Sequence, residues 1–152
     1  MLGMWWLAAG YFALAVCSAV LPWVNGELVM LSAIPLAGSP VELGALVAIV
    51  AAGQMTGKAA MYWVGQRTIR RRGSHLEQRV NRWRERLSRC PASGLAVMFV
   101  SAVVGIPPFY VVAVAAGALN VAFGRFVAVG MLGRLIHFGA VAFIPHLTWR
   151  GL

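Results

Sequence analysis

The chain alternates long apolar runs with short segments rich in proline and glycine. Apolar residues dominate positions 4–21, 43–66 and 123–145. An α-helix needs about 20 mainly apolar residues to cross the hydrocarbon core of a bilayer. We therefore predict a membrane helix in each of these three runs.

Between these runs the apolar pattern is broken twice by prolines. The first break lies at residues 22–27 and the second at residues 105–108. The apolar pieces beside the breaks are too short to cross about 30 Å of hydrocarbon. Broken backbone at membrane depth is tolerated only where protein buries it or where it lines a water-filled cavity. We therefore predict two re-entrant hairpins, one in residues 22–66 and one in residues 91–147.

The two halves of the chain follow one pattern. In each half a proline break is followed by a short apolar piece and then by a glycine-paced span with one basic residue, Lys58 or Arg134. Membrane transporters are often built from such repeats. The pattern predicts an all-α integral membrane protein, a polytopic helical bundle with two re-entrant, proline-broken hairpins in a pseudo-repeat. We expect residues 1–152 to form a single membrane domain.

Residues 67–90 separate the two halves and carry most of the charge. They hold nine arginines against two glutamates, and the positive-inside rule places such a loop in the cytoplasm. Ser74-His75-Leu76-Glu77 has the form of a helix capping box, and apolar residues recur at helical spacing as far as Leu87. We predict a cytoplasmic amphipathic helix on the membrane surface. The residues expected to touch lipid are Trp83, Arg79, Arg82 and Arg86.

The composition narrows the class of protein. With 61% hydrophobic and 11% charged residues, the chain lacks the charged surface of a water-soluble domain. Its net charge of +9 resides mainly in the arginine-rich loop, but no nucleic-acid-reading motif accompanies it, so we expect no nucleic-acid partner. A bundle of this size could enlarge itself as a homo-oligomer. Residues 4–21 could alternatively be a secretory signal peptide, although no positively charged segment precedes them.

Several kinds of enzyme are disfavoured by the sequence. The chain contains no aspartate, and its three histidines are far apart. Metal centres, phosphotransfer sites and an ordinary Ser-His-Asp triad are therefore disfavoured. No phosphate-cradling loop of the Walker type is found either. We expect no enzymatic activity, no metal and no cofactor.

Charged residues inside or beside the apolar runs are the first candidates for function, because charge at membrane depth is costly. Glu27 follows the first break and could exchange protons as a cavity opens to either side, or it could cap a helix end. Arg134 lies near the middle of its span and could pair with Glu27 or bind a phosphate. His137, one turn later, could join either contact. Lys58 could bind an anion or extend to the membrane interface.

Neutral polar residues could complete the same cavity. Asn25, Tyr62 and Tyr110 could offer hydrogen bonds there, although Tyr62 could instead anchor its helix at the membrane interface. The predicted site assigns transport or proton coupling to Glu27. It assigns substrate binding to Lys58, Arg134, His137, Asn25, Tyr62 and Tyr110.

These segments resemble the DedA family, whose shared region is also called the SNARE-associated or VTT domain. The most specific match is Gly53-xxx-Gly57-xxxx-Tyr62-Trp63-x-Gly65-x-Arg67, which is similar to the glycine-tyrosine-glycine-arginine stretch of the family. Residues 22–27 resemble the acidic motif of the first re-entrant segment. Pro107 with Gly117 resembles the proline and glycine of the second.

The resemblance implies two re-entrant hairpins that face each other. It also implies a role in moving phospholipids or polyprenyl-phosphate carriers across bilayers, coupled to protons in some members. Glu27 matches the essential glutamate of the family. The chain departs from the family at Lys58, where an aspartate is common, and at Val104 and Tyr110, where two arginines are expected. Lys58 and Arg134 are then the available cations.

Together these observations predict a DedA-type membrane transporter that flips or scrambles an anionic lipid, either a polyprenyl phosphate or a phospholipid. Its partners would be the anionic headgroups of membrane lipids. We expect it in the bacterial inner membrane, with the loop from Arg67 to Arg89 in the cytoplasm. Two alternatives are a small membrane scaffold that recruits a partner protein and a transporter of a small ion or osmolyte.

Overall fold

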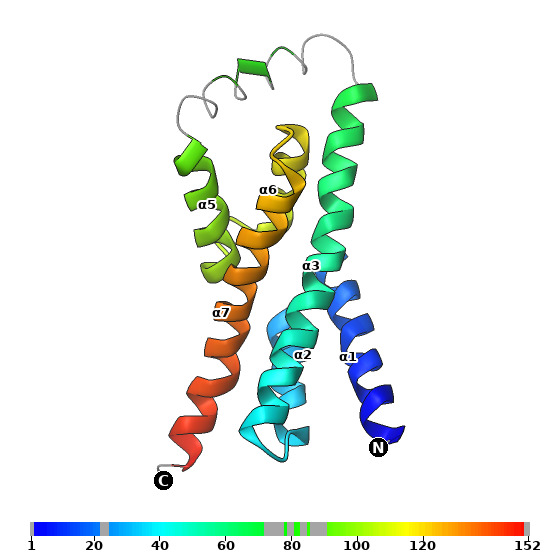
Figure 1. Cartoon of the computed structure of the whole chain (residues 1–152), viewed down its shortest axis with the longest axis vertical. Coiled ribbons are helices and arrows are strands. Elements are labelled where there is room, and N and C mark those ends of the chain that lie inside the picture. Colours follow the sequence, from blue (N-terminus) through cyan, green and yellow to red (C-terminus); the bar gives the residue numbers. More distant parts are fainter. Residues whose placement is uncertain are drawn as a thin grey trace. The chain divides into compact units, whose positions relative to one another are not determined.

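The computed structural model describes residues 2–21, 25–71, 78, 81–82, 85 and 91–150, and every regular element within them is a helix (Figure 1). The all-helical class predicted from the sequence is thus confirmed for the described residues. The elements are α1 (Leu2–Val20), α2 (Gly26–Ala33), the 3-10 helix η1 (Ile34–Leu36), α3 (Pro40–Arg71), α5 (Pro91–Val104), α6 (Phe109–Ala118) and α7 (Phe123–Arg150).

Two of these helices are long and apolar enough to cross a membrane. They are α3 over Pro40–Thr68, with 29 residues, and α7 over Phe123–Ile144, with 22 residues. At 1.5 Å per residue, even the shorter stretch measures about 33 Å, which matches a hydrocarbon core of about 30 Å. The apolar stretch of α1, Trp5–Val20, is shorter, as are those of α2, α5 and α6.

The start of α3 follows from a local capping motif. Ser39 Oγ accepts a hydrogen bond from the backbone N–H of Glu42 at 3.2 Å, and the Glu42 carboxylate accepts one from the backbone N–H of Gly38 at 2.7 Å. Proline is well suited to the first helical position, where its missing N–H costs nothing, and Pro40 stands there. The helix therefore begins before residue 43 and extends past residue 66, the two ends predicted from apolar character alone.

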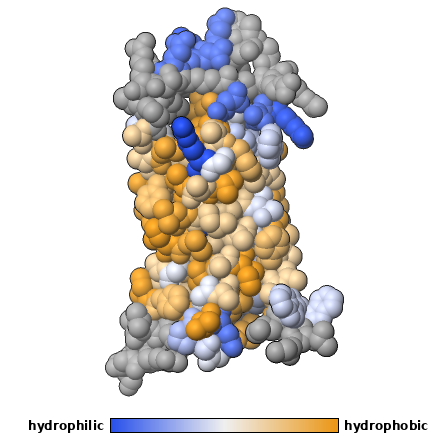
Figure 2. All heavy atoms as spheres, viewed as in Figure 1, coloured by the Kyte–Doolittle hydropathy of each residue, from blue (hydrophilic) through white to orange (hydrophobic). Residues whose placement is uncertain are grey.

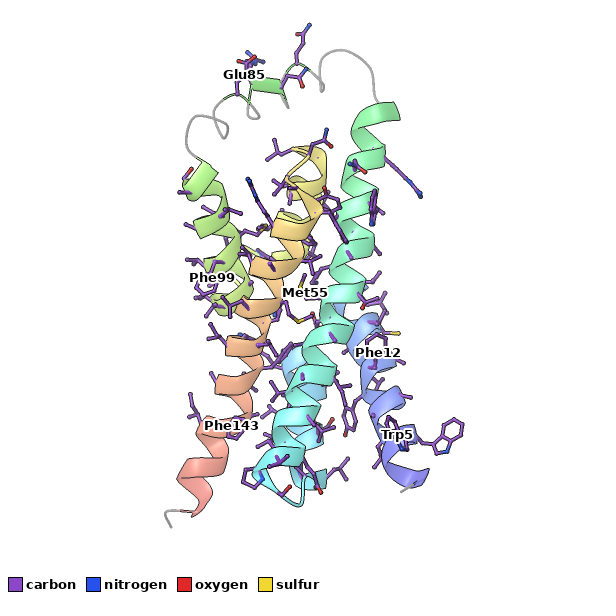
Figure 3. The ribbon with its side chains drawn as sticks, viewed as in Figure 1. Trp5, Phe12, Met55, Glu85, Phe99 and Phe143 are labelled. Atoms are coloured by element: carbon purple, nitrogen blue, oxygen red, sulfur yellow. The ribbon has the colours of Figure 1, made fainter. Side chains whose placement is uncertain are left out.

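Large apolar side chains are exposed along the described helices. Trp5, Trp6 and Val41 are 74%, 77% and 82% exposed. Hydrophobic residues make up most of the coloured surface in Figure 2, and Trp5 extends away from α1 in Figure 3. Contiguous apolar surface on this scale is unusual for a soluble monomer and is expected where helices contact lipid.

The chain divides into two compact units. Unit 1 comprises Met1–Gly57 and Arg134–Leu152, and unit 2 comprises Lys58–Gly133. Unit 1 therefore contains α1, α2, η1, the first part of α3 and the last part of α7. Unit 2 contains α5, α6, the last part of α3 and the first part of α7.

The helix boundaries of the two halves recur at a nearly constant interval. Helix α2 begins at Gly26 and α6 at Phe109, 83 residues later. Helix α3 begins at Pro40 and α7 at Phe123, again 83 residues later. The order of a helix, a short helix and a long helix therefore occurs twice along the chain.

In unit 1, small residues allow α1 to approach α3 closely. A Cβ atom at Gly53 or Gly57 would collide with the backbone oxygen of Phe12 or Val16 in α1. Helix α1 also packs against α2, and the Tyr11 hydroxyl donates a hydrogen bond to the Ser32 carbonyl at 3.0 Å. The short helix α2 is therefore held against α1 by packing and by a hydrogen bond.

Unit 2 combines close backbone packing with an aromatic core. Gly65 lies against the Val114 carbonyl and Gly117 against the Tyr62 carbonyl, so α3 and α6 touch backbone to backbone. The Tyr62 ring stacks on Phe126 with the ring centroids 5.1 Å apart, and Phe109 stacks on the same Phe126 ring. These contacts join α3, α6 and α7 in one core.

The turn between α5 and α6 coincides with the predicted proline break at residues 105–108. The Ile106–Pro107 peptide bond is cis, and Gly105 has a φ of 82°, a left-handed conformation that glycine adopts readily. The Ser101 hydroxyl donates a hydrogen bond to the Pro107 carbonyl at 2.6 Å. The second break predicted from the sequence is thus a defined turn.

The arginine-rich loop is described only in part. Gln78, Asn81, Arg82 and Glu85 are helical and exposed. Their spacing of three and four residues puts them on one side of a helix, which is the polar side of the predicted amphipathic helix. Trp83, Arg79 and Arg86, the other predicted lipid contacts, lie outside the described residues. The start of the predicted loop, at Arg67, still belongs to α3, which continues to Arg71.

Candidate functional site

Glu27 lies in the first turn of α2, and the N-cap residue Asn25 fixes this turn. Asn25 precedes the helix in an extended conformation, and its Oδ1 accepts a hydrogen bond from the Glu27 backbone N–H at 2.9 Å. A side-chain oxygen at this position satisfies a backbone donor that the helix leaves unpaired. The capping role falls to Asn25, which the sequence had suggested as a cavity-lining residue, and the Glu27 side chain is left to make other contacts.

Glu27 contacts a histidine on α7 within unit 1. His137 Nε2 lies 3.5 Å from Glu27 Oε1, a distance at which a protonated imidazole forms an ion pair. The His137 side chain is 12% exposed, whereas the Glu27 side chain is 52% exposed. The carboxylate is therefore accessible from outside the protein, while its partner is largely enclosed.

Arg134 is a second basic residue of α7 that interacts with Glu27. It lies three residues before His137 on α7 and interacts electrostatically with the Glu27 carboxylate. Its guanidinium carbon is 5.8 Å from the centre of the Phe138 ring, within the range of a cation–π contact. Unit 1 thus brings together Glu27, Arg134 and His137, which were all predicted as site residues.

The three side chains have complementary chemistry. A carboxylate and an imidazole are groups that can take up or release a proton, whereas a guanidinium keeps its charge. A guanidinium also offers a planar set of donors that matches a phosphate group. When Glu27 is charged it competes with other anions for Arg134, and when Glu27 is neutral that competition ends. The cluster can therefore couple protonation to anion binding.

Two polar residues of this region were missed in the sequence. Gln54 of α3 is 3% exposed and donates a hydrogen bond from Nε2 to Ser18 Oγ of α1 at 2.5 Å. Ser18 is 7% exposed and donates in turn to the Ala15 carbonyl at 2.9 Å. A glutamine within an apolar span is a usable signal, because a buried amide needs partners.

The remaining predicted residues belong to unit 2. Lys58 is only 5% exposed, and its Nζ lies 5.8 Å from the centre of the Tyr110 ring. The Tyr62 hydroxyl donates a hydrogen bond to the Val121 carbonyl at 2.6 Å. Lys58 and Tyr110 are thus brought together, whereas Tyr62 is part of the aromatic core. The predicted candidates divide between the units, with Asn25, Glu27, Arg134 and His137 in unit 1.

Comparison with known proteins gives one match, which covers nearly the whole chain. The sequence model of the VTT domain matches residues 1–147. No curated protein and no solved structure matches the chain significantly. The match agrees with two helices long enough to cross a membrane and with the resemblance seen in the sequence. The chain belongs to the VTT domain family, the DedA or SNARE-associated family of membrane proteins.

Proposed function

We propose that the protein flips or scrambles an anionic lipid, a polyprenyl phosphate or a phospholipid, across a bacterial inner membrane. The observation that carries this proposal is the cluster of Glu27, His137 and Arg134 at the start of α2. A carboxylate and two basic groups beside a broken helix are costly in lipid and are expected where an ion or headgroup passes.

The lengths of the short helices support the proposed re-entrant hairpins. Helix α2 has 8 residues and α6 has 10, so they measure about 12 and 15 Å at 1.5 Å per residue. Neither can cross a hydrocarbon core of about 30 Å. In the proposed arrangement each short helix enters the membrane and its chain returns to the same side, so that the broken backbone lines a polar path.

In the proposed mechanism the two ends of the lipid molecule take different paths. The acyl or prenyl chain stays in the bilayer while the anionic headgroup crosses between the hairpins. Arg134 and Lys58 attract the headgroup, and protonation of Glu27 releases Arg134 to bind it. Arg82 and its neighbours on the cytoplasmic loop hold that end of the protein against anionic lipids. The reaction breaks no covalent bond.

Transport by purified protein tests this proposal. Wild type, Glu27→Gln and Glu42→Gln would be reconstituted in proteoliposomes, and transbilayer movement of a labelled polyprenyl phosphate and a labelled phospholipid would be measured with and without a pH gradient. Glu42 is a suitable control because it is an exposed carboxylate of the same unit that contacts the Gly38 backbone rather than a basic residue. We expect Glu27→Gln to lose transport and Glu42→Gln to keep it.

Other results would favour the alternative functions. Dependence of the rate on the pH gradient in wild type would add proton coupling. If folded wild-type protein moves neither lipid faster than empty liposomes do, lipid transport is wrong. A scaffold would then be supported by loss of cellular function on substitution of Trp83 and Leu87, and a small-solute transporter by solute flux that depends on Glu27.

A further inference from the structure

Gln54 contacts the helix that carries Glu27. A Cβ atom at Gly26, the first residue of α2, would overlap with Gln54 Nε2 and would lie 3.5 Å from the Phe138 ring. The missing side chain at Gly26 therefore lets the start of α2 sit directly against α3 and α7. Glu27 is the next residue, so its backbone position depends on this contact.

The orientation of the Gln54 amide is set by a chain of hydrogen bonds. The Ser18 hydroxyl has one proton, which it donates to the Ala15 carbonyl, so it must accept from Gln54. Gln54 therefore directs its NH₂ group, rather than its carbonyl, toward Ser18 and the Gly26 backbone. Both residues are almost fully buried, which makes an alternative partner from solvent costly.

Helix α2 needs such external support because it is short. An isolated helix of 8 residues is unstable, since too few hydrogen bonds offset the cost of nucleation. Its far end is tied to α1 through Tyr11 and Ser32. At its near end, the Asn25 cap fixes only local geometry, so the position of the first turn against α7 depends on the contact between Gly26 and Gln54.

We propose that Gln54, supported by Ser18, is a positioning residue that holds the first turn of α2 so that Glu27 stays within reach of His137. This inference rests on the proposed function for its effect on transport, but not for its effect on structure. The separation of 3.5 Å between Glu27 and His137 is close to the limit for an ion pair, so a displacement of α2 by about 1 Å would weaken it.

Cross-linking tests the position of α2 without requiring transport. Cys17 and Cys90 would be replaced by serine, and cysteines introduced by Glu27→Cys and His137→Cys would be joined with a short bifunctional thiol reagent. We expect Gln54→Leu to lower the cross-linking rate several-fold. Gln66→Leu is the matched control, because it is the same change on the same helix but its side chain contacts Asn120 in unit 2. It should leave the rate unchanged.

Transport in the native background is the second measurement. Gln54→Leu should slow lipid movement about tenfold, since misplacement of a functional group by about 1 Å can cost up to a hundredfold in rate. Gln54→Asn keeps a buried amide and provides the same test if the leucine variant does not fold. The melting temperature of each variant in detergent is compared with that of Gln66→Leu, so that a general loss of stability is recognised.

The outcomes separate this proposal from the proposed function. An unchanged cross-linking rate in a folded Gln54 variant would overturn the positioning role, whatever the transport rate. If wild type moves no lipid, the proposed function is wrong, and the cross-linking result still decides the role of Gln54. A lower cross-linking rate together with a melting temperature like that of Gln66→Leu would support positioning.

Discussion

The two halves of the chain repeat one order of helices, but the short helix of unit 1 and the short helix of unit 2 differ at their starts. Helix α2 begins with Gly26 and Glu27, and α6 begins with Phe109 and Tyr110. The second residue of each helix meets a basic side chain from a long helix, since Glu27 contacts His137 and Tyr110 lies beside Lys58. Only unit 1 places a carboxylate there. The repeated skeleton thus carries an ionisable acid in one unit and a neutral aromatic ring in the other.

The buried contacts beside the short helices also differ between the two units. Unit 1 buries the hydrogen-bonded pair of Ser18 and Gln54 beside α2, whereas unit 2 surrounds the start of α6 with stacked aromatic rings. Buried polar groups fix orientation, and large aromatic side chains supply most of the burial energy of a core. We therefore expect substitutions around the start of α2 in unit 1 to affect mainly transport and substitutions in the aromatic core of unit 2 to affect mainly stability.

The largest expected effect is the loss of Arg134. Arg134→Gln should slow lipid movement about ten- to hundredfold, since the loss of a hydrogen bond to a charged group costs about 1.5–3 kcal/mol. The measurement is transbilayer movement of a labelled anionic lipid in proteoliposomes. Arg125→Gln removes an exposed arginine from the same helix, in unit 2, and should have little effect. Equal rates for wild type and Arg134→Gln would contradict the proposed role of Arg134 in binding the headgroup.

The next effect concerns the stability of unit 2. Gly117→Ala would force a methyl group against the backbone of α3 at Tyr62, which cannot move aside as a side chain could. We expect a loss of about 1–3 kcal/mol in the free energy of unfolding, as for other overpacked cores. Unfolding in mixed micelles would measure it. Gly44→Ala, where no atom lies within 4 Å of the added Cβ, is the control and should not destabilise. Equal stability of the two variants would argue against backbone contact between α3 and α6.

Most of the helical skeleton could be predicted from the sequence, because proline and glycine act locally. Proline lacks a backbone donor and is disfavoured in the interior of a helix, so helix ends were correctly expected near both breaks, although Pro145 lies within α7. The beginning of α3 was placed too late because apolar character was used to define it, whereas Ser39, Pro40 and Glu42 together start the helix at a polar position. The end of α7 at Arg150 also lies beyond the apolar span.

The residues of the candidate site could be predicted mainly where charge marked them. Glu27, Arg134 and His137 were found because ionisable groups in an apolar chain require partners. Gln54 and Ser18 are neutral and are 36 positions apart in the sequence, so only the packing of α1 on α3 brings them together. Gln54 and His137 are also 83 positions apart, the interval between the two long helices. Equivalent positions of the repeat therefore both contribute to the surroundings of α2.

A matched pair of tyrosines gives the smallest expected effects. Tyr62→Phe in unit 2 removes a hydrogen bond of 2.6 Å from a ring that is 3% exposed, and the cost should be about 1.5 kcal/mol. Tyr11→Phe in unit 1 removes a bond of 3.0 Å at an exposed carbonyl, and the cost should be about 0.5 kcal/mol. Both changes delete one oxygen atom and keep the ring, so the difference between them reflects the surroundings of the hydroxyl.

The free energy of unfolding of both variants would be measured in the same mixed micelles. A larger cost for Tyr62→Phe would agree with an aromatic core that stabilises unit 2. The reverse order would mean that the hydrogen bond between α1 and α2 contributes more to stability than the buried hydrogen bond of Tyr62 does. In that case a contact of unit 1 would stabilise the protein more than a buried contact of unit 2, and the separation of a transporting unit from a stabilising unit would be wrong.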